Sequence, residues 1–432
     1  MLSKLPLLFL FPFTALLSQT TSQAPQPTQS GVTLRARTQL VVVDVVVTDK
    51  GQNPVRNLKA SDFTLLESGR PQQIKSFEEH TGQSAKSPVA TLPVNPPGIF
   101  SNYSSALTND AVNVLLVDTL NTPVTDQIYL HDQFRKYLKT AKPGAPMAIF
   151  GLTTKLLFLQ SFTSDPELLK AAIDKNISHS PLIGRVTGGN TLQSADEMSE
   201  IVATSGLGAD PAQAAMMQQV VADLKQFDAQ QTSFQSQLRA KYTLDAINQL
   251  ARYLSGIPGR KNLIWFSGSF PLDVLPDGSI NDPFTVVASS EAEYRETTNL
   301  LTRAQVAVYP IDARGATTSP NMDVSQSTAI YVDDPKRFNA DEVKYHLTAA
   351  AENMTMFRMA DDSGGHAFLN TNDLVDAVNK ATAAGSHYYT LTYSPNDSNW
   401  NGNFRKIQVK LQQSGLNLAY RHGYFADDPD SP

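Results

Sequence analysis

The middle of the chain alternates between two hydrophobic patterns. Nearly continuous apolar runs occur at residues 112–117, 146–152, 262–266 and 306–311. The segment 244–254 instead has apolar residues at helical spacings, and glycine and proline follow it. Strands buried on both faces have continuous apolar runs, whereas the helices that cover them are amphipathic. The alternation predicts an α/β domain at residues 111–385, with a largely parallel sheet covered by helices on both faces.

Segments with β-strand character flank this domain on both sides. Residues 31–80 contain the run LVVVDVVV and a hairpin-like turn, SGRP, at 68–71. Residues 386–425 contain further β-prone runs separated by Asn, Asp and Gly. The first group alone is too short for a β-sandwich, which uses roughly seven strands. We therefore expect both groups to form one sandwich-like module, with the α/β domain inserted between them.

Three segments interrupt these patterns. Residues 81–110 are rich in Ser, Pro and Asn and are typical of a linker. Residues 178–239 are rich in Gly, Ala, Gln and Ser, and they are longer than an ordinary α/β connection. They are expected to form an insertion, either an exposed elaboration or a partner-binding surface. Residues 426–432 are expected to form a polar tail.

The first residues have the pattern of a secretory signal. Lys4 precedes an apolar segment, LPLLFLFPFTALL, which is too short to span about 30 Å of hydrocarbon. Small residues at Ser22 and Ala24 suit cleavage, so residues 1–24 are predicted to be a signal peptide. No later segment is apolar enough to span a membrane. We expect a protein exported to the periplasm, the cell surface or the extracellular space.

Composition narrows the classes of partner. The 432 residues include 35 basic and 41 acidic side chains, a net charge of −6, and no cysteine. An exported fold must then be stable without disulfides. No long basic run is present, which argues against nucleic acid or an anionic membrane surface as a partner. The seven histidines lack metal-ligand spacing, and no HExxH, CxxC, P-loop or GxGxxG motif occurs.

Candidate chemistry lies where the predicted strands end, because ligands bind at the carboxyl edge of open parallel sheets. This edge is rich in hydroxyl groups and poor in carboxylates: Asp118, Thr119, Thr122, Thr153, Thr154, Ser267, Ser269 and Asp312. Divalent cations usually need one or two carboxylates, and Asp118 is the plausible anchor. Its carboxylate could equally cap the following loop or helix without any metal.

Several segments together resemble a known family. They are VNVLLVDTLNTPVTDQ, GIPGRKNLIWFSGSFP, AVYPIDARG and MADDSGGHAFLNTNDLVDAVNKA. They resemble the von Willebrand factor A-like (VWFA-like) fold, and more narrowly the VWFA-related domain group described from acidobacterial exported proteins. The resemblance extends to VVVDVVVTDKGQNPVRNLKASDFTLLESGRPQQI and covers most of the mature chain. It implies a doubly wound, Rossmann-type sheet with a metal-ion-dependent adhesion site at the carboxyl edge.

That adhesion site uses an Asp-x-Ser-x-Ser loop, a Thr from a second loop and an Asp after the fourth strand. Asp118 and Thr122 match the first loop, but Leu120 replaces an oxygen ligand. Ser267 stands in place of the late Asp, which removes a negative charge. The Thr is either Thr243, which fits the order of the chain, or Thr191, in a GGNT loop. The resemblance thus implies a degenerate site that binds Mg²⁺ or Mn²⁺ weakly, or no metal.

We therefore expect a non-enzymatic protein that binds a protein or other macromolecule through this edge. Asn121, Ser269 and Asp312 are the further candidates for partner contacts. The alternative is a metal-free structural or assembly subunit of the cell envelope, in which the insertion makes the contacts. A hydrolase is a remote alternative, because DSGG at 362–365 resembles the nucleophile loop of one serine peptidase class. Here these glycines are expected to serve a turn between a helix and a strand at 365–369.

Overall fold

The computed structural model describes residues 39–81, 111–140, 146–174, 210–270, 272–274, 276, 278, 280–315, 319 and 335–427. The predicted signal peptide, nearly all of the predicted linker and Thr191 lie outside the described residues. So do residues 178–209 of the predicted insertion.

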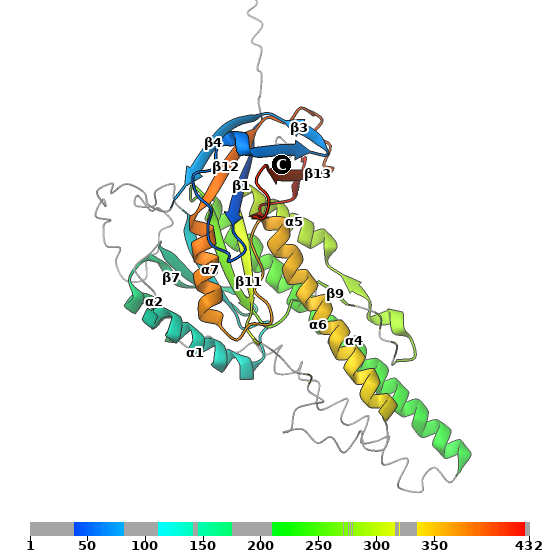
Figure 1. Ribbon diagram of the computed structural model, residues 1–432. Helices are drawn as coiled ribbons and strands as arrows, with labels where there is room; N and C mark the ends of the chain where they lie inside the picture. Colours follow the sequence, from blue (N-terminus) through cyan, green and yellow to red (C-terminus); the bar gives the residue numbers. More distant parts are fainter. Residues whose placement is uncertain are drawn as a thin grey trace, which may run out of the picture. The chain divides into compact units, whose positions relative to one another are not determined.

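A five-stranded sheet forms the centre of the α/β domain (Figure 1). Its spatial order is β11 (Val306–Asp312), β8 (Lys261–Ser267), β5 (Val112–Asp118), β6 (Met147–Leu152) and β7 (Leu156–Thr163). The first four strands are parallel, and β7 pairs antiparallel with β6 at one edge. A short antiparallel ribbon, β9 (Asp273–Val274) with β10 (Ala288–Ser289), lies outside this sheet, and the 3₁₀ turn η3 (Pro283–Val286) precedes β10.

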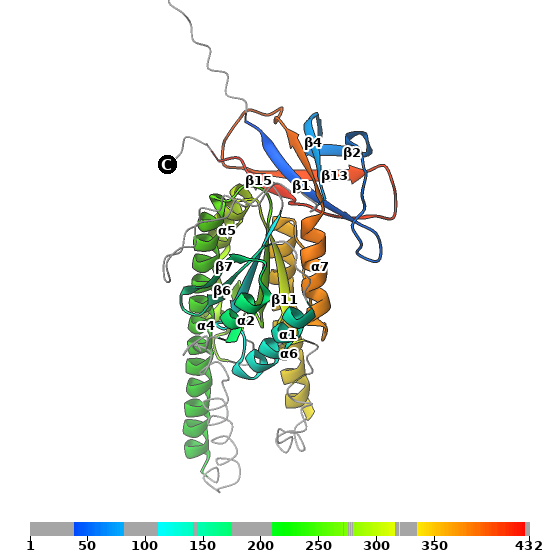
Figure 2. The same cartoon turned by 90° about the vertical axis from the view of Figure 1, so that its left-hand side faces the viewer.

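Helices cover both faces of the central sheet (Figure 2). One face packs against α1 (Val124–Thr140), α2 (Pro166–Asp174) and α7 (Leu374–Ser386). The other packs against α4 (Pro211–Ser255), α5 (Glu291–Arg303) and α6 (Pro335–Ser363). The strands are apolar throughout because alternate side chains serve opposite faces. In β8, for example, Leu263 and Trp265 face α4, whereas Ile264 and Phe266 face the other helical layer.

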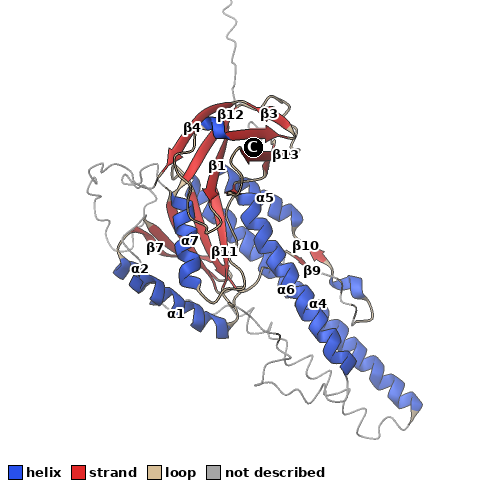
Figure 3. Ribbon diagram, viewed as in Figure 1, coloured by secondary structure: helices blue, strands red, loops and turns tan. Residues whose placement is uncertain are grey.

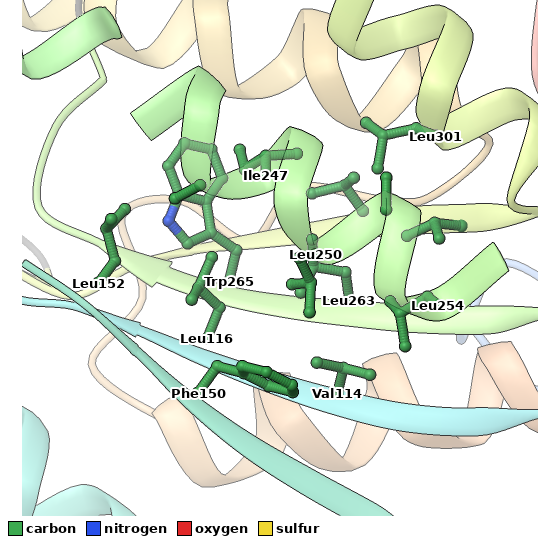
Figure 4. Packing of buried hydrophobic residues seen from close by; sticks show 14 of the residues in the cluster. Val114, Leu116, Phe150, Leu152, Ile247, Leu250, Leu254, Leu263, Trp265 and Leu301 are labelled. Atoms are coloured by element: carbon green, nitrogen blue, oxygen red, sulfur yellow. The ribbon is translucent and has the colours of Figure 1, made fainter. Parts of the chain in front are cut away.

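Figure 4 shows the packing between α4 and the sheet. Trp265 is fully buried beside Ile247 and Leu116, and its ring meets Phe270 edge to face with centroids 5.1 Å apart. The large apolar area of this indole anchors the helix to the sheet.

The N- and C-terminal strands build a separate β module of two antiparallel four-stranded sheets (Figure 3). One has the order β14 (Asn417–Ala419), β1 (Val41–Thr48), β12 (Tyr388–Tyr393), β4 (Ile74–His80). The other has the order β15 (Gly423–Phe425), β13 (Phe404–Leu411), β2 (Phe63–Glu67), β3 (Arg70–Gln72), and the 3₁₀ turn η1 (Ala60–Asp62) precedes β2. Their facing side chains form one core that includes Val43, Leu65 and Leu391. The predicted fold class, a doubly wound sheet with a sandwich-like module from both ends of the chain, is confirmed.

A buried polar cluster lies inside this β module. Glu67 is only 3% exposed. Its Oε2 accepts hydrogen bonds from the hydroxyls of Tyr393 (2.5 Å) and Tyr424 (2.9 Å), and its Oε1 lies 3.4 Å from Arg405 Nη1. The cluster therefore joins β2, from the N-terminal group of strands, to three residues that follow the α/β domain in the sequence: Tyr393, Arg405 and Tyr424.

Two elements differ from the sequence expectation. Helix α4 is continuous over 45 residues and begins at Pro211, inside the predicted insertion. The side chain of Asp210 caps the N-terminus of α4 by accepting a hydrogen bond from the Ala212 amide at 2.9 Å. The next glycine in the sequence, Gly256, directly follows the last residue of the helix. The predicted strand at 365–369 is reduced to one parallel bridge, between Ile311 and Phe368. Among the described residues, no helix is long and apolar enough to cross a membrane.

Candidate functional site

The candidate site lies at the carboxyl edge of the central sheet. Asp118, Ser267 and Asp312 are the last residues of β5, β8 and β11, and Ser267 is the register partner of Asp312. Thr243 approaches from α4. Parallel strands end at the same edge, so chain order alone brings these groups together.

The Asp118 carboxylate accepts all its hydrogen bonds from the protein itself. Its Oδ1 accepts from the Asn121 backbone N–H at 2.9 Å. Its Oδ2 lies 2.7 Å from Asn121 Nδ2, 2.9 Å from Ser267 Oγ and 3.2 Å from Trp265 Nε1. Four donors from two separate segments therefore surround one carboxylate.

The side-chain amide of Asn121 lies between Asp118 and Thr243. Its Nδ2 donates to Asp118 Oδ2 and to Thr243 Oγ1, both at 2.7 Å. An ionised carboxylate only accepts hydrogen bonds, so the amide nitrogen, and not its oxygen, faces it. The amide thus bridges the carboxylate and the threonine hydroxyl that the resemblance assigns as cation ligands.

The other candidate residues are also turned into the protein. Thr122 is fully buried, and its Oγ1 accepts from the Gly268 amide at 2.9 Å. Leu120 is fully buried in the core beneath α4. Asn121, Thr243, Ser267, Ser269 and Asp312 are buried as well. None of the described candidates presents an exposed side chain.

A charged network adjoins this cluster. Arg314 donates two hydrogen bonds to Asp312, each 3.0 Å long, and a third to Glu352 at 2.8 Å. Burial raises the pKa of Glu352, and it lowers the pKa of the nearby Arg239. Arg239 Nη1 lies 3.5 Å from Ser269 Oγ. The candidates predicted from the sequence do not include Arg239, Arg314 or Glu352. Of these three, only Arg314 carries a sequence signal, because it lies in the IDARG segment directly after β11.

Burial raises the pKa of Asp118 to about 6, although its hydrogen bonds act in the opposite direction. Between pH 4 and pH 6 the folded state then holds a proton that the unfolded state has lost, so lowering the pH through this window favours folding. We expect this group to add about 2 kcal/mol to the free energy of unfolding at pH 4 relative to pH 7. Urea denaturation of the native protein and of Asp118→Asn at several pH values measures the difference. Equal pH dependence of both proteins would contradict the assignment.

The residues at this edge do not fit a divalent cation. Mg²⁺ and Mn²⁺ need several oxygen ligands around the ion, usually with one or two carboxylates. Here Asp118, the one carboxylate among the assigned cation ligands, accepts four hydrogen bonds, Leu120 supplies no oxygen, and Ser267 supplies no charge. Within the described ranges, no group of three or more His, Cys, Asp or Glu side chains could hold a metal ion. A cation could enter only by displacing the Asn121 amide.

The DSGG segment packs against the sheet. Ser363 Oγ lies 2.7 Å from the carbonyl oxygen of Met359 and accepts from the Val308 amide at 2.9 Å. A Cβ added to Gly365 would lie 1.9 Å from the Val308 carbonyl oxygen, so only glycine fits there. These contacts give the segment a packing role in the turn after α6.

No family model matches the sequence, and no curated protein matches it. The chain is similar to the PilB minor pilin from Streptococcus sanguinis, with 8% identity over 64% of this chain and 61% of the pilin, and a TM-score of 0.29. It is similar to an aerotolerance-related membrane protein from Bacteroides fragilis, with 9% identity over 63% of this chain and 98% of that chain, and a TM-score of 0.30. A third similar structure is a von Willebrand factor type A protein from Catenulispora acidiphila, with 11% identity over 75% and 68% and a TM-score of 0.21. Sequence identities and TM-scores as low as these support no argument about function.

Proposed function

We propose that the protein is an exported, non-enzymatic module that binds other proteins without a metal ion. The observation that supports this most directly is the internal hydrogen bonding of Asp118. A metal-dependent adhesion site needs an open coordination position for a carboxylate of the partner. Here the Asn121 amide already satisfies both Asp118 and Thr243.

The carboxyl edge then has a structural role. Asp118 lies on β5, Trp265 and Ser267 on β8, and Thr243 on α4, so the cluster ties two strands and a helix together. Buried hydrogen bonds of this kind hold the elements that they join in one arrangement. Recognition of a partner would use surfaces outside this cluster.

Export and the absence of nucleic-acid binding are proposed from the sequence. The apolar segment after Lys4 supports a signal peptide, and the net charge of −6 disfavours polyanionic partners. No catalytic constellation is proposed, because the contacts of Ser363 are to backbone groups.

Calorimetric titration of Mg²⁺ and Mn²⁺ into the native protein tests metal independence. We expect no saturable heat at millimolar concentrations, and the same trace for Asp118→Asn, which removes the charge but keeps the shape of the side chain. Saturable binding that disappears in Asp118→Asn would overturn the proposal. It would show that a cation displaces the Asn121 amide.

A second candidate function is an assembly subunit of the cell envelope. It is favoured by large apolar side chains that remain exposed on the helical layer. On α4 they are Met216, Val220, Phe227 and Phe234, and on α6 they are Val343, Leu347, Met354 and Phe357. Soluble monomers seldom expose so many large apolar side chains on neighbouring elements.

A further inference from the structure

One face of α4 is polar beside the carboxyl edge of the sheet, and Arg239 lies in the middle of this polar stretch. Thr232, Ser236, Arg239 and Thr243 follow one another at spacings of three and four residues, so they share that face. Thr232 is exposed, Ser236 and Arg239 are 9% and 7% exposed, and Thr243 is fully buried. This face of α4 therefore leads from the protein surface down to the buried hydrogen bonds around Asp118.

The guanidinium of Arg239 has only weak hydrogen bonds. Its Nη1 lies 3.5 Å from Ser269 Oγ and its Nη2 lies 3.4 Å from Ser236 Oγ, both long for a hydrogen bond. Its Nε is buried and has no acceptor among the residues that the structure describes. The hydrogen bonds around Asp118, by comparison, include three between 2.7 and 2.9 Å. Arg239 is therefore buried without a good acceptor.

Two carboxylates act on Arg239 from a distance, but neither pairs with it. The charges of Glu352 and Asp118 raise the pKa of Arg239, against the larger effect of burial, which lowers it. Glu352 accepts from Arg314 at 2.8 Å, and Asp118 accepts from other donors. Arg314 is well satisfied, because it donates three hydrogen bonds of 2.8–3.0 Å to Asp312 and Glu352. Arg239 forms no ion pair with any described residue.

Resting on the proposed binding of proteins without a metal ion, we propose that Arg239 binds a carboxylate group, supplied by an acidic side chain of the partner. The edge of a guanidinium formed by Nε and Nη2 can donate two parallel hydrogen bonds to one carboxylate. In Arg239 the Nε has no acceptor, and the Ser236 hydroxyl is a weak competitor for Nη2. A buried guanidinium without an acceptor is costly, so an entering carboxylate gains by satisfying it.

The charges around Arg239 also select the kind of anion. Glu352 and Asp118 repel any anion that approaches, and the repulsion grows with the charge of that anion. A carboxylate, with one negative charge, therefore suits Arg239 better than a phosphate dianion.

NMR of the native protein, isotope-labelled on the arginine side-chain nitrogens, tests the site directly. Titration with a blocked peptide that contains one central glutamate is expected to shift the Nε–H signal of Arg239, with saturation at millimolar peptide. Arg239→Lys identifies this signal by its loss. The same peptide with glutamine in place of glutamate should cause no shift. Arg252, exposed on the same helix and 3.3 Å from Glu296, is the control whose signal should show no saturable shift.

Acetate distinguishes the two sources of a carboxylate. Binding of acetate without binding of the glutamate peptide would mean that the site admits only small free carboxylates, and it would overturn the assignment to a side chain of the partner. A signal that neither probe shifts would overturn the site itself. Metal independence would still be judged separately by the cation titration.

The stability of two glutamine variants separates a binding role of Arg239 from a structural one. Arg314→Gln disrupts three hydrogen bonds of 2.8–3.0 Å and should clearly lower the midpoint of urea denaturation. Arg239→Gln disrupts only two long hydrogen bonds and should lower the midpoint by less. If both variants were equally destabilised, Arg239 would serve the packing of α4, and the inference would be overturned.

Discussion

Replacing Asp118 with alanine is expected to lower the free energy of unfolding by about 3–5 kcal/mol. The change removes a shared acceptor from a fully buried site and leaves the Asn121 backbone N–H and Trp265 Nε1 without a partner. Asn121 Nδ2 keeps its bond to Thr243, and Ser267 Oγ keeps its bond to the Ser269 carbonyl oxygen. Each unsatisfied buried donor costs about 1–3 kcal/mol, and the relief of burying a carboxylate offsets part of the sum. Urea denaturation followed by circular dichroism measures the effect.

Thr122→Ala is the matched control for this experiment. Thr122 is buried at the same edge, but its hydroxyl accepts one hydrogen bond, from the Gly268 amide. We expect a loss of about 1–2 kcal/mol. If Asp118→Ala were no more destabilising than Thr122→Ala, these donors would not depend on the carboxylate. Because the alanine variant is destabilised for this reason, Asp118→Asn is the better variant for the cation titration.

Glu67→Ala is expected to destabilise the β module by about 3–5 kcal/mol. The substitution leaves the Arg405 guanidinium and the hydroxyls of Tyr393 and Tyr424 inside the module without a common acceptor. Burial and the Glu67 carboxylate also keep the pKa of Tyr393 well above its usual range, so this hydroxyl stays protonated and needs an acceptor. The midpoint of chemical denaturation, followed by circular dichroism, measures the loss.

Glu78→Ala controls for the loss of a glutamate from the same module. Its side chain is 65% exposed on β4 and lies 3.9 Å from His80. A surface carboxylate of this kind contributes little, so we expect a change within about 0.5 kcal/mol. A similarly small effect of Glu67→Ala would mean that water replaces the carboxylate inside the sandwich.

The central strands were predictable because burial on both faces leaves a continuous apolar run. The run at 112–117 corresponds to β5, Val112–Asp118, and the run at 306–311 to β11, Val306–Asp312. Edge strand β7, Leu156–Thr163, was missed because its apolar run, LLFL, is only four residues long, and so short a run does not distinguish a strand from a segment of buried helix. The first half of α4 was missed because its large apolar side chains, such as Phe227, face away from the core.

The position of the candidate site was predictable, but its internal geometry was not. Chain order places Asp118 and Ser267 at one edge of the sheet. The direction of the Asn121 side chain depends on how the loop after β5 turns back, and residue type alone does not reveal that. Arg239 and Glu352 come from helices far apart in the sequence, so no spacing pattern could join them to Asp312.

The pairing of β1 with β12 also determines the order in which the protein can fold. Asp44 and Thr390, which share a hydrogen bond across these strands, are 346 positions apart. The apolar strand VVVDVVVT is synthesised well before both of its neighbours in the sheet, β12 and β14. Non-local pairing of this kind is slow, and an apolar strand with open edges is prone to aggregate. The newly made chain must therefore keep this strand shielded until β12 and β14 have been synthesised.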